Sequence, residues 1–124
     1  MKILALDSSS LVASVAITED KKLLGEYNVN NGLTHSKNLM PMLTELMKTL
    51  GLKPSDIDMY AASIGPGSFT GIRIGVTSIK AMAYATGKPV ASVPTLDALA
   101  YNAEGFDGVI CPIMDARNNQ VYTA

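Results

Sequence analysis

The stretch from Gly65 to Gly75, GPGSFTGIRIG, constrains the fold more than any other part of this sequence. It follows a run of small and apolar residues from Met59 to Ile64, which is typical of a buried strand. A helical pattern then extends from Phe69 to Thr86, and Gly87 is placed to end it. A strand, a glycine-bounded turn and a helix in direct succession predict an α/β fold.

The flanking segments extend this pattern on both sides. Three apolar or alternating runs predict the strands of an antiparallel meander, at Ile3–Leu6, Leu11–Ile17 and Leu23–Val29. Thr34 stands where an N-cap would precede a helix that ends at Gly51, and Pro41 either falls in the first turn of a late-starting helix or, as we expect, bends one that starts at His35. The remaining predicted elements are a buried strand at Val90–Val93, a helix from Thr95 to about Asn102, a strand at Val109–Met114, a turn over 115–119 and a strand from Gln120. Together they predict a mixed sheet of five or more strands with helices on its faces.

Size and composition restrict the classes of function. A chain of 124 residues is long enough for one ordinary domain. Its ten basic and eleven acidic residues give a net charge of −1, too balanced for a protein whose affinity comes from neutralising phosphates, and the 6% aromatic content provides few side chains for stacking on bases. Autonomous nucleic-acid binding is therefore disfavoured.

Single residues exclude further classes. His35 is the only histidine, so the chain cannot form a histidine-pair metal site or a zinc protease motif. A Ser-His-Asp triad is possible by count, but the sequence has no nucleophile elbow to indicate one. His35 itself is expected to hold the turn at a helix start. The only cysteine, Cys111, cannot form an internal disulfide and is expected to be a buried, inert thiol. The first apolar run, Ile3–Leu6, is too short for a signal peptide or a spanning helix, so we expect a cytoplasmic protein.

Two turns could face phosphate groups. One follows the first strand and contains Asp7, Ser8 and Ser9; the other contains Gly65, Gly67, Ser68 and Thr70 and opens the second long helix. Backbone N–H groups at a helix start favour anions, and a carboxylate at a strand end suits metal-assisted phosphoryl transfer. Equally, the glycines could serve only a tight turn and close packing, and Asp7 could only stabilise a turn. The second turn is not a P-loop, because no lysine follows Gly71.

Two helical stripes could form an interface between chains. The first helix carries apolar residues at helical spacing and is rich in methionine, which adapts to exchangeable surfaces; the second is rich in small residues, which permit close approach. A helix packed on its own sheet would explain part of the first stripe. The predicted partner-binding residues are Leu39, Met42, Leu43, Leu46, Met47, Gly75, Ser78 and Met82.

Five segments resemble the bacterial TsaB family, also called YeaZ: KILALDSSS, THSKNLMPML, SIGPGSFTGIRIGV, KAMAY and KPVASVPTLDALA. The resemblance runs across the whole chain. It implies an actin-like or sugar-kinase-like ATPase lobe of the RNase H-like type. Because the family's full length is close to twice this one, residues 1–124 would be its N-terminal lobe, with the second lobe outside this chain.

The resemblance also implies a function. Family members are needed to make N6-threonylcarbamoyladenosine in tRNAs that read codons beginning with adenine, as non-catalytic partners of the catalytic paralogue TsaD. It implies pairing with TsaD or with a second copy through the two helices, TsaE in the larger complex, indirect contact with tRNA, and ATP or ADP only in the assembled complex. The family has also been described as glycoprotease homologues, but this sequence contains no set of protease residues. The alternative function is a nucleotide-binding phosphotransferase or ATPase lobe built on the two turns.

Overall fold

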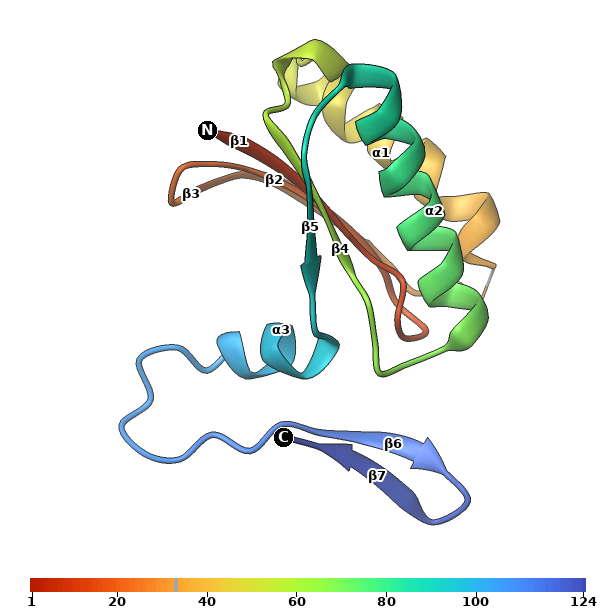
Figure 1. The fold of residues 1–124 in the computed structure, drawn as a ribbon, viewed down its shortest axis with the longest axis vertical. Helices are drawn as coiled ribbons and strands as arrows, with labels where there is room; N and C mark the ends of the chain where they lie inside the picture. The colour runs from red at the N-terminus through yellow and green to blue at the C-terminus, as the bar shows by residue number, and fades with distance from the viewer. Residues whose placement is uncertain (33) are drawn as a thin grey trace.

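The computed structural model describes residues 1–32 and 34–124, and its centre is a mixed five-stranded sheet (Figure 1). Its strand order is β3-β2-β1-β4-β5. β1, β2 and β3 pair antiparallel as a meander, whereas β4 and β5 run parallel to β1. The strands are β1 (Lys2–Asp7), β2 (Ala13–Glu19), β3 (Lys22–Val29), β4 (Met59–Ser63) and β5 (Val90–Val93). The predicted α/β class and mixed sheet are confirmed.

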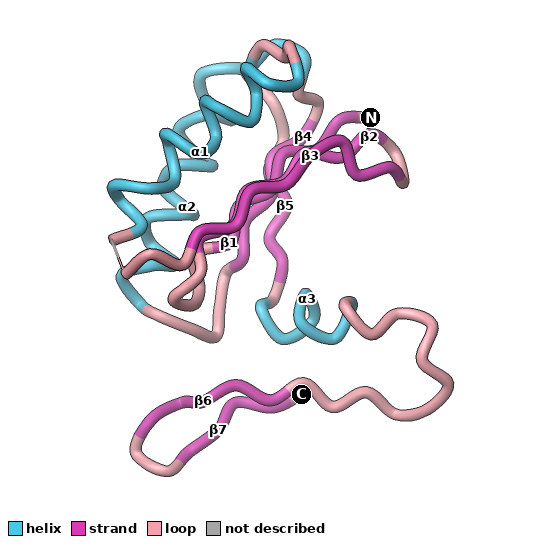
Figure 2. Tube along the Cα trace, turned by 180° about the vertical axis from the view of Figure 1, so that it is seen from behind, coloured by secondary structure: helices cyan, strands magenta, loops and turns pink. Residues whose placement is uncertain are grey.

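Two long helices, α1 (His35–Leu50) and α2 (Phe69–Thr86), cover the same face of this sheet (Figures 1 and 2). α1 packs on β2 and β3, and α2 packs on β4. The bounds of α2 agree with the prediction, and both helices end at a glycine in the left-handed conformation, Gly51 and Gly87. α1 starts at His35 with Pro41 inside it, as the second of the two alternatives for Pro41 requires.

The buried core lies between this helix layer and the sheet. Alternate residues of the inner strands, such as Leu4, Leu6 and Val15, point into it because side chains of a strand alternate between faces. Tyr60 from β4, Ile79 from α2 and Leu46 from α1 complete it and are at most 1% exposed. The core thus fixes how α1 and α2 lie on the sheet and beside each other.

The edges of the fold differ from the prediction. β5 was expected to be buried, but it is the edge strand, and Val90 is 48% exposed. β2 begins at Ala13, because Leu11 lies in an exposed bend. A short 3₁₀ turn, η1 (Pro54–Asp56), precedes β4.

After β5 the chain leaves the sheet. α3 (Thr95–Tyr101) is followed by a two-stranded hairpin of β6 (Ile113–Arg117) and β7 (Gln120–Thr123), which lies apart from the five-stranded sheet (Figure 1). The predicted strand at Val109–Met114 is wrong in its bounds, because residues 109–112 form no ladder, and the predicted turn over 115–119 shrinks to Asn118 and Asn119. Cys111 is exposed, so the expectation of a buried thiol is also wrong.

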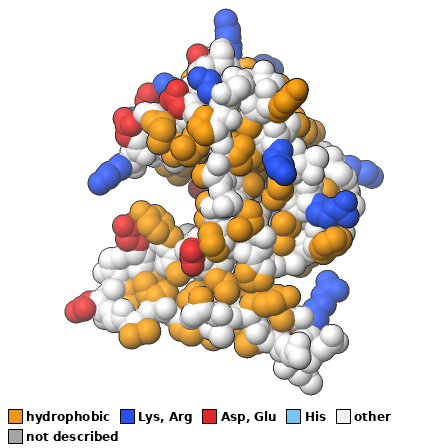
Figure 3. All heavy atoms as spheres, in the orientation of Figure 1, with side chains coloured by type: hydrophobic (Ala, Val, Ile, Leu, Met, Phe, Trp, Pro, Cys, Tyr) orange, Lys and Arg blue, Asp and Glu red, His pale blue; other side chains and the backbone are white. Residues whose placement is uncertain are grey.

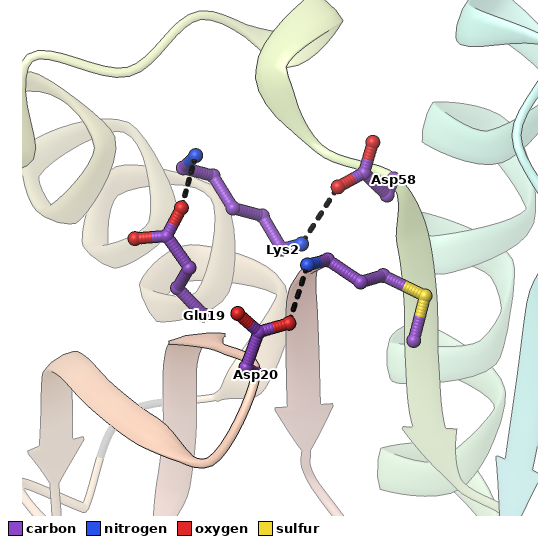
Figure 4. A network of polar contacts seen from close by, with 5 residues as sticks. Lys2, Glu19, Asp20 and Asp58 are labelled. Atoms are coloured by element: carbon purple, nitrogen blue, oxygen red, sulfur yellow. Dashed lines mark hydrogen bonds and ion pairs between the residues drawn. The ribbon is translucent and has the colours of Figure 1, made fainter.

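A polar network ties the start of β1 to its neighbours (Figure 4). The Met1 amine pairs with Asp20 and the Lys2 ammonium with Glu19, both at 2.7 Å. The Lys2 backbone N–H donates to Asp58 at 2.7 Å, and this bond lowers the pKa of that carboxyl. The hydrogen bond to Asp20 raises the pKa of the Met1 amine, and the one to Glu19 raises the pKa of Lys2. The N-terminus is thereby fixed to the end of β2 and to the loop before β4.

Candidate functional site

The two turns singled out in the sequence lie against each other. The Ser68 backbone N–H donates to the Ser9 carbonyl at 2.7 Å. The buried Ser8 hydroxyl donates to the Gly71 carbonyl, also at 2.7 Å. The structure therefore brings the Asp7–Ser9 turn together with the Gly65–Gly71 turn, as expected of strand ends at one edge of a sheet.

The glycines of the second turn fill the space between the two turns. A Cβ atom added at Gly67 or Gly71 would lie inside van der Waals distance of the carbonyl oxygens of Ser9 or Ser8, respectively. One added at Gly75 would meet the Ser8 hydroxyl. These close approaches explain the glycines through packing alone.

Several polar atoms of these turns have partners inside the protein. One oxygen of Asp7 accepts from the Ser9 N–H at 2.9 Å and from the Ser9 hydroxyl at 2.6 Å. Ser68 caps α2, because its hydroxyl accepts from the Gly71 N–H at 3.2 Å. Gly65 exchanges two hydrogen bonds with Thr95, at 2.9 and 3.2 Å. Within the described ranges, no group of three or more His, Cys, Asp or Glu side chains could hold a metal ion.

His35 joins α1 to the first turn. Its Nε2 atom lies 2.6 Å from the Ser10 carbonyl oxygen, so Nε2 carries the hydrogen and donates. Its Nδ1 atom is buried and has no hydrogen-bond partner among the described residues. The expectation that His35 holds a turn at a helix start is confirmed.

A groove of about 630 Å³ runs between α1 and α2 on the outer side of the helix layer. Its lining is mainly apolar and includes several small and hydroxyl side chains. Met40, which is 45% exposed, lies on the α1 side. The groove is lined by Ser36, Met40, Thr70, Arg73, Ile74, Thr77, Ser78, Ala81 and Met82.

The predicted partner-binding residues lie in three different places in the structure. Ser78 and Met82 do line the groove, and Thr70 lies there as well. Gly75 instead packs against Ser8. The apolar stripe of α1 faces the chain's own sheet, because the strands that precede this helix already offer an apolar face for it to cover. Leu39, Met42, Leu43, Leu46 and Met47 are thus buried in the core and are not available to a partner in this structure.

Sequence reasoning missed the residues that do line the groove. Met40, Arg73, Ile74, Thr77 and Ala81 sit beside the predicted stripes on their helices. A signal for three of them existed in the sequence. Ile74, Thr77 and Ala81 follow Thr70 at intervals of four, three and four, which gives α2 a second stripe beside the one containing Gly75 and Ile79.

Comparison with known proteins identifies the family of this chain. The family described as "TsaD: tRNA N6-adenosine threonylcarbamoyltransferase" matches residues 31–124. The chain belongs to this family. Among its relatives is the Bacillus subtilis tRNA threonylcarbamoyladenosine biosynthesis protein TsaB, 39% identical over 99% of this chain and 54% of that protein. The Escherichia coli protein of the same name is 34% identical over 100% of this chain and 54% of its own length.

A solved structure agrees with the sequence matches. YeaZ from Pseudomonas aeruginosa superposes with a TM-score of 0.85 at 33% identity, covering 98% of this chain and 58% of that one. The resemblance to TsaB and YeaZ proteins and the ATPase-like fold inferred from the sequence motifs are confirmed. The chain spans little more than half the length of these relatives.

Proposed function

We propose that this chain acts in the biosynthesis of N6-threonylcarbamoyladenosine in tRNA, as a non-catalytic subunit that binds and stabilises the catalytic paralogue TsaD. The observation that carries the pathway is the match to TsaB, a protein named for this biosynthesis, over 99% of the chain. The groove between α1 and α2 supports the partner role, since residues of both helices line it and its lining is mainly apolar.

The shape of the groove suits a helix. Amphipathic helices bind by laying apolar side chains into grooves of this kind. Thr77, Ser78 and Ala81 have short side chains, so a partner helix can approach α2 closely. Met40 and Met82 adjust to irregular surfaces, which suits a contact made after folding. The partner site therefore consists of the groove residues rather than the buried stripe of α1.

A charge in the groove tests this proposal. Ala81→Asp places a carboxylate on the exposed groove side of α2 without disturbing the core. Burying an unpaired carboxylate costs several kcal/mol and each 1.4 kcal/mol is tenfold in affinity, so we expect the Kd for TsaD to rise by about a hundredfold or more. Titration calorimetry with the cognate TsaD measures this, and modified-nucleoside analysis of tRNA from cells carrying only the variant reports the biological consequence.

Tyr84→Asp is the matched control, because Tyr84 lies on the same helix, is 92% exposed and stands outside the groove. It should bind TsaD like the unaltered chain. Met47→Asp would not be informative, because Met47 is buried in the core and its replacement would unfold the chain. Equal binding by the Ala81→Asp variant and the unaltered chain would reject the groove as the partner site.

The proposal extends to the other members of the system. The same groove would support a homodimer in the absence of TsaD, TsaE would join the larger complex, and tRNA would be reached through that complex.

No intrinsic cofactor is proposed, and ATP or ADP would bind only in the assembly. The pairing of the Ser8, Ser9 and Ser68 polar atoms inside the protein supports this. We expect no heat on titrating the chain alone with Mg-ATP and unchanged tRNA modification with Asp7→Ala. Strong ATP binding and loss of modification would favour the alternative of a phosphotransferase lobe.

A further inference from the structure

Among the residues that the structure describes, Arg73 is the only charged one that lines the groove. Its guanidinium lies over the Phe69 ring, 5.3 Å from the ring centre. Phe69 is 74% exposed, so this stacked pair stands at the rim of the groove beside the start of α2. Stacking uses the face of the guanidinium and leaves the N–H groups at its edge free to donate.

Arg73 has no ion pair within the part of the chain that the structure describes. A partner that covers the groove would therefore remove an unpaired positive charge from water, which is costly unless the partner provides an acceptor. A carboxylate matches the planar, two-pronged donor edge of arginine better than any neutral acceptor. Because Phe69 already holds the guanidinium in place, less side-chain entropy is lost when the pair forms.

The charge of the whole helix layer also favours an acidic partner. α1 and α2 together carry four basic residues and one acidic residue, whereas the rest of the chain carries six basic and ten acidic residues. In Figure 3 the charged side chains on the right-hand side, where the helices lie, are Lys and Arg, whereas the left-hand side carries both acidic and basic side chains. A second copy would bring the same positive layer to the contact. The basic residues of the two helices are Lys37, Lys48, Arg73 and Lys80, and the acidic one is Glu45.

We propose that Arg73, stacked on Phe69, is the specificity anchor of the groove. It pairs with an Asp or Glu side chain on an acidic helical face of the partner, and it favours such a partner over a second copy of this chain, whose α1 and α2 carry four basic residues and one acidic residue. This inference rests on the proposed function, because it names the chemistry of the partner that the groove accepts.

The test compares two charge reversals on one helix. Arg73→Glu should raise the Kd for the cognate TsaD at least thirtyfold, because two carboxylates would face each other. Lys80→Glu makes the same change in charge on an exposed position outside the groove and should change Kd less than threefold. Arg73→Lys should lie between them, since lysine keeps the charge but loses the two-pronged geometry. Unchanged circular dichroism spectra and thermal midpoints would show that each variant folds.

A compensating change then identifies the pair. Each Asp and Glu on the surface helices of TsaD is replaced in turn by Arg, and one of these variants should restore binding to the Arg73→Glu chain by tenfold or more. The inference is overturned if Arg73→Glu binds like the unaltered chain, if Lys80→Glu weakens binding equally, or if no acidic position gives rescue. If Ala81→Asp abolishes binding while Arg73→Glu does not, the proposed function survives without this inference. If neither variant has an effect, both fail.

Discussion

At the scale of single residues, the contact between Gly75 and Ser8 shows why a helix tolerates glycine in its interior. Alanine in a helix interior is ordinarily about 1 kcal/mol better than glycine. Here an added Cβ would collide with the Ser8 hydroxyl, which is buried and bonded to the Gly71 carbonyl, so it cannot move without losing that bond. We therefore expect Gly75→Ala to lower the free energy of unfolding by about 1–2 kcal/mol, as measured by urea denaturation.

The same substitution in a Ser8→Ala chain tests whether the contact with Ser8 causes this loss of stability. In a Ser8→Ala chain the nearest remaining atom of residue 8, its Cβ, lies 3.6 Å from the added methyl group, which is ordinary contact. Gly75→Ala should then be neutral or stabilising by up to about 1 kcal/mol, so the two changes are not additive. Thr77→Ala, an exposed site on the same helix, controls for helix propensity. Equal effects of Gly75→Ala in both backgrounds would contradict the assigned contact.

The Asp58 carboxyl makes acid stability depend on one hydrogen bond. Its pKa is lowered chiefly by the bond from the Lys2 N–H, so its contribution to stability is present above its unfolded pKa and is lost as pH falls through its folded pKa. We expect Asp58→Asn to lower the urea midpoint at pH 7, and the difference from the unaltered chain to shrink below about pH 4 and vanish at lower pH. Asp107→Asn, at an exposed position, controls for loss of a charge. A difference that is constant with pH would show that the charge of Asp58 is not responsible.

At the scale of elements, the β6–β7 hairpin is the part of the fold least tied to the rest. It contributes no residue to the buried apolar cluster, and every residue of β7 is exposed. Two-stranded hairpins are marginally stable alone. We expect its backbone amides to exchange with solvent more than about tenfold faster than those of β1 and β4, in hydrogen-exchange mass spectrometry. Deletion of residues 109–124 should leave the thermal midpoint of the remaining sheet nearly unchanged, whereas a large drop would show that the hairpin supports the sheet.

Local signals in the sequence were sufficient to predict where some elements begin and end, but not others. Ser68 and Gly87 bound α2 by capping, which depends on neighbouring residues alone, so its bounds were predictable. The apolar run from Val109 predicted a strand, yet a strand also needs a neighbouring strand to pair with, and only the residues from Ile113 onward pair with β7.

The stripe at Leu39 correctly identified an apolar helix face. Periodicity does not say what covers such a face, and here the chain's own sheet covers it. The groove was missed for the same reason, since it exists only once α1 and α2 lie side by side.

At the scale of the whole molecule, charge is segregated although the net charge is only −1. The helix layer is positive and the remainder is negative, so the two kinds of association proposed for the groove should respond to salt in opposite directions. Binding of an acidic helical face is favoured by attraction that salt screens, whereas pairing of two like-charged layers is opposed by repulsion that salt also screens. Raising NaCl from about 50 to 500 mM should therefore weaken binding to TsaD by about tenfold and strengthen self-association. Light scattering of the chain alone measures self-association, and calorimetry measures the Kd for TsaD. In the Arg73→Glu variant, the Kd for TsaD should depend less on salt. Parallel trends would mean that apolar burial, not charge, selects the partner.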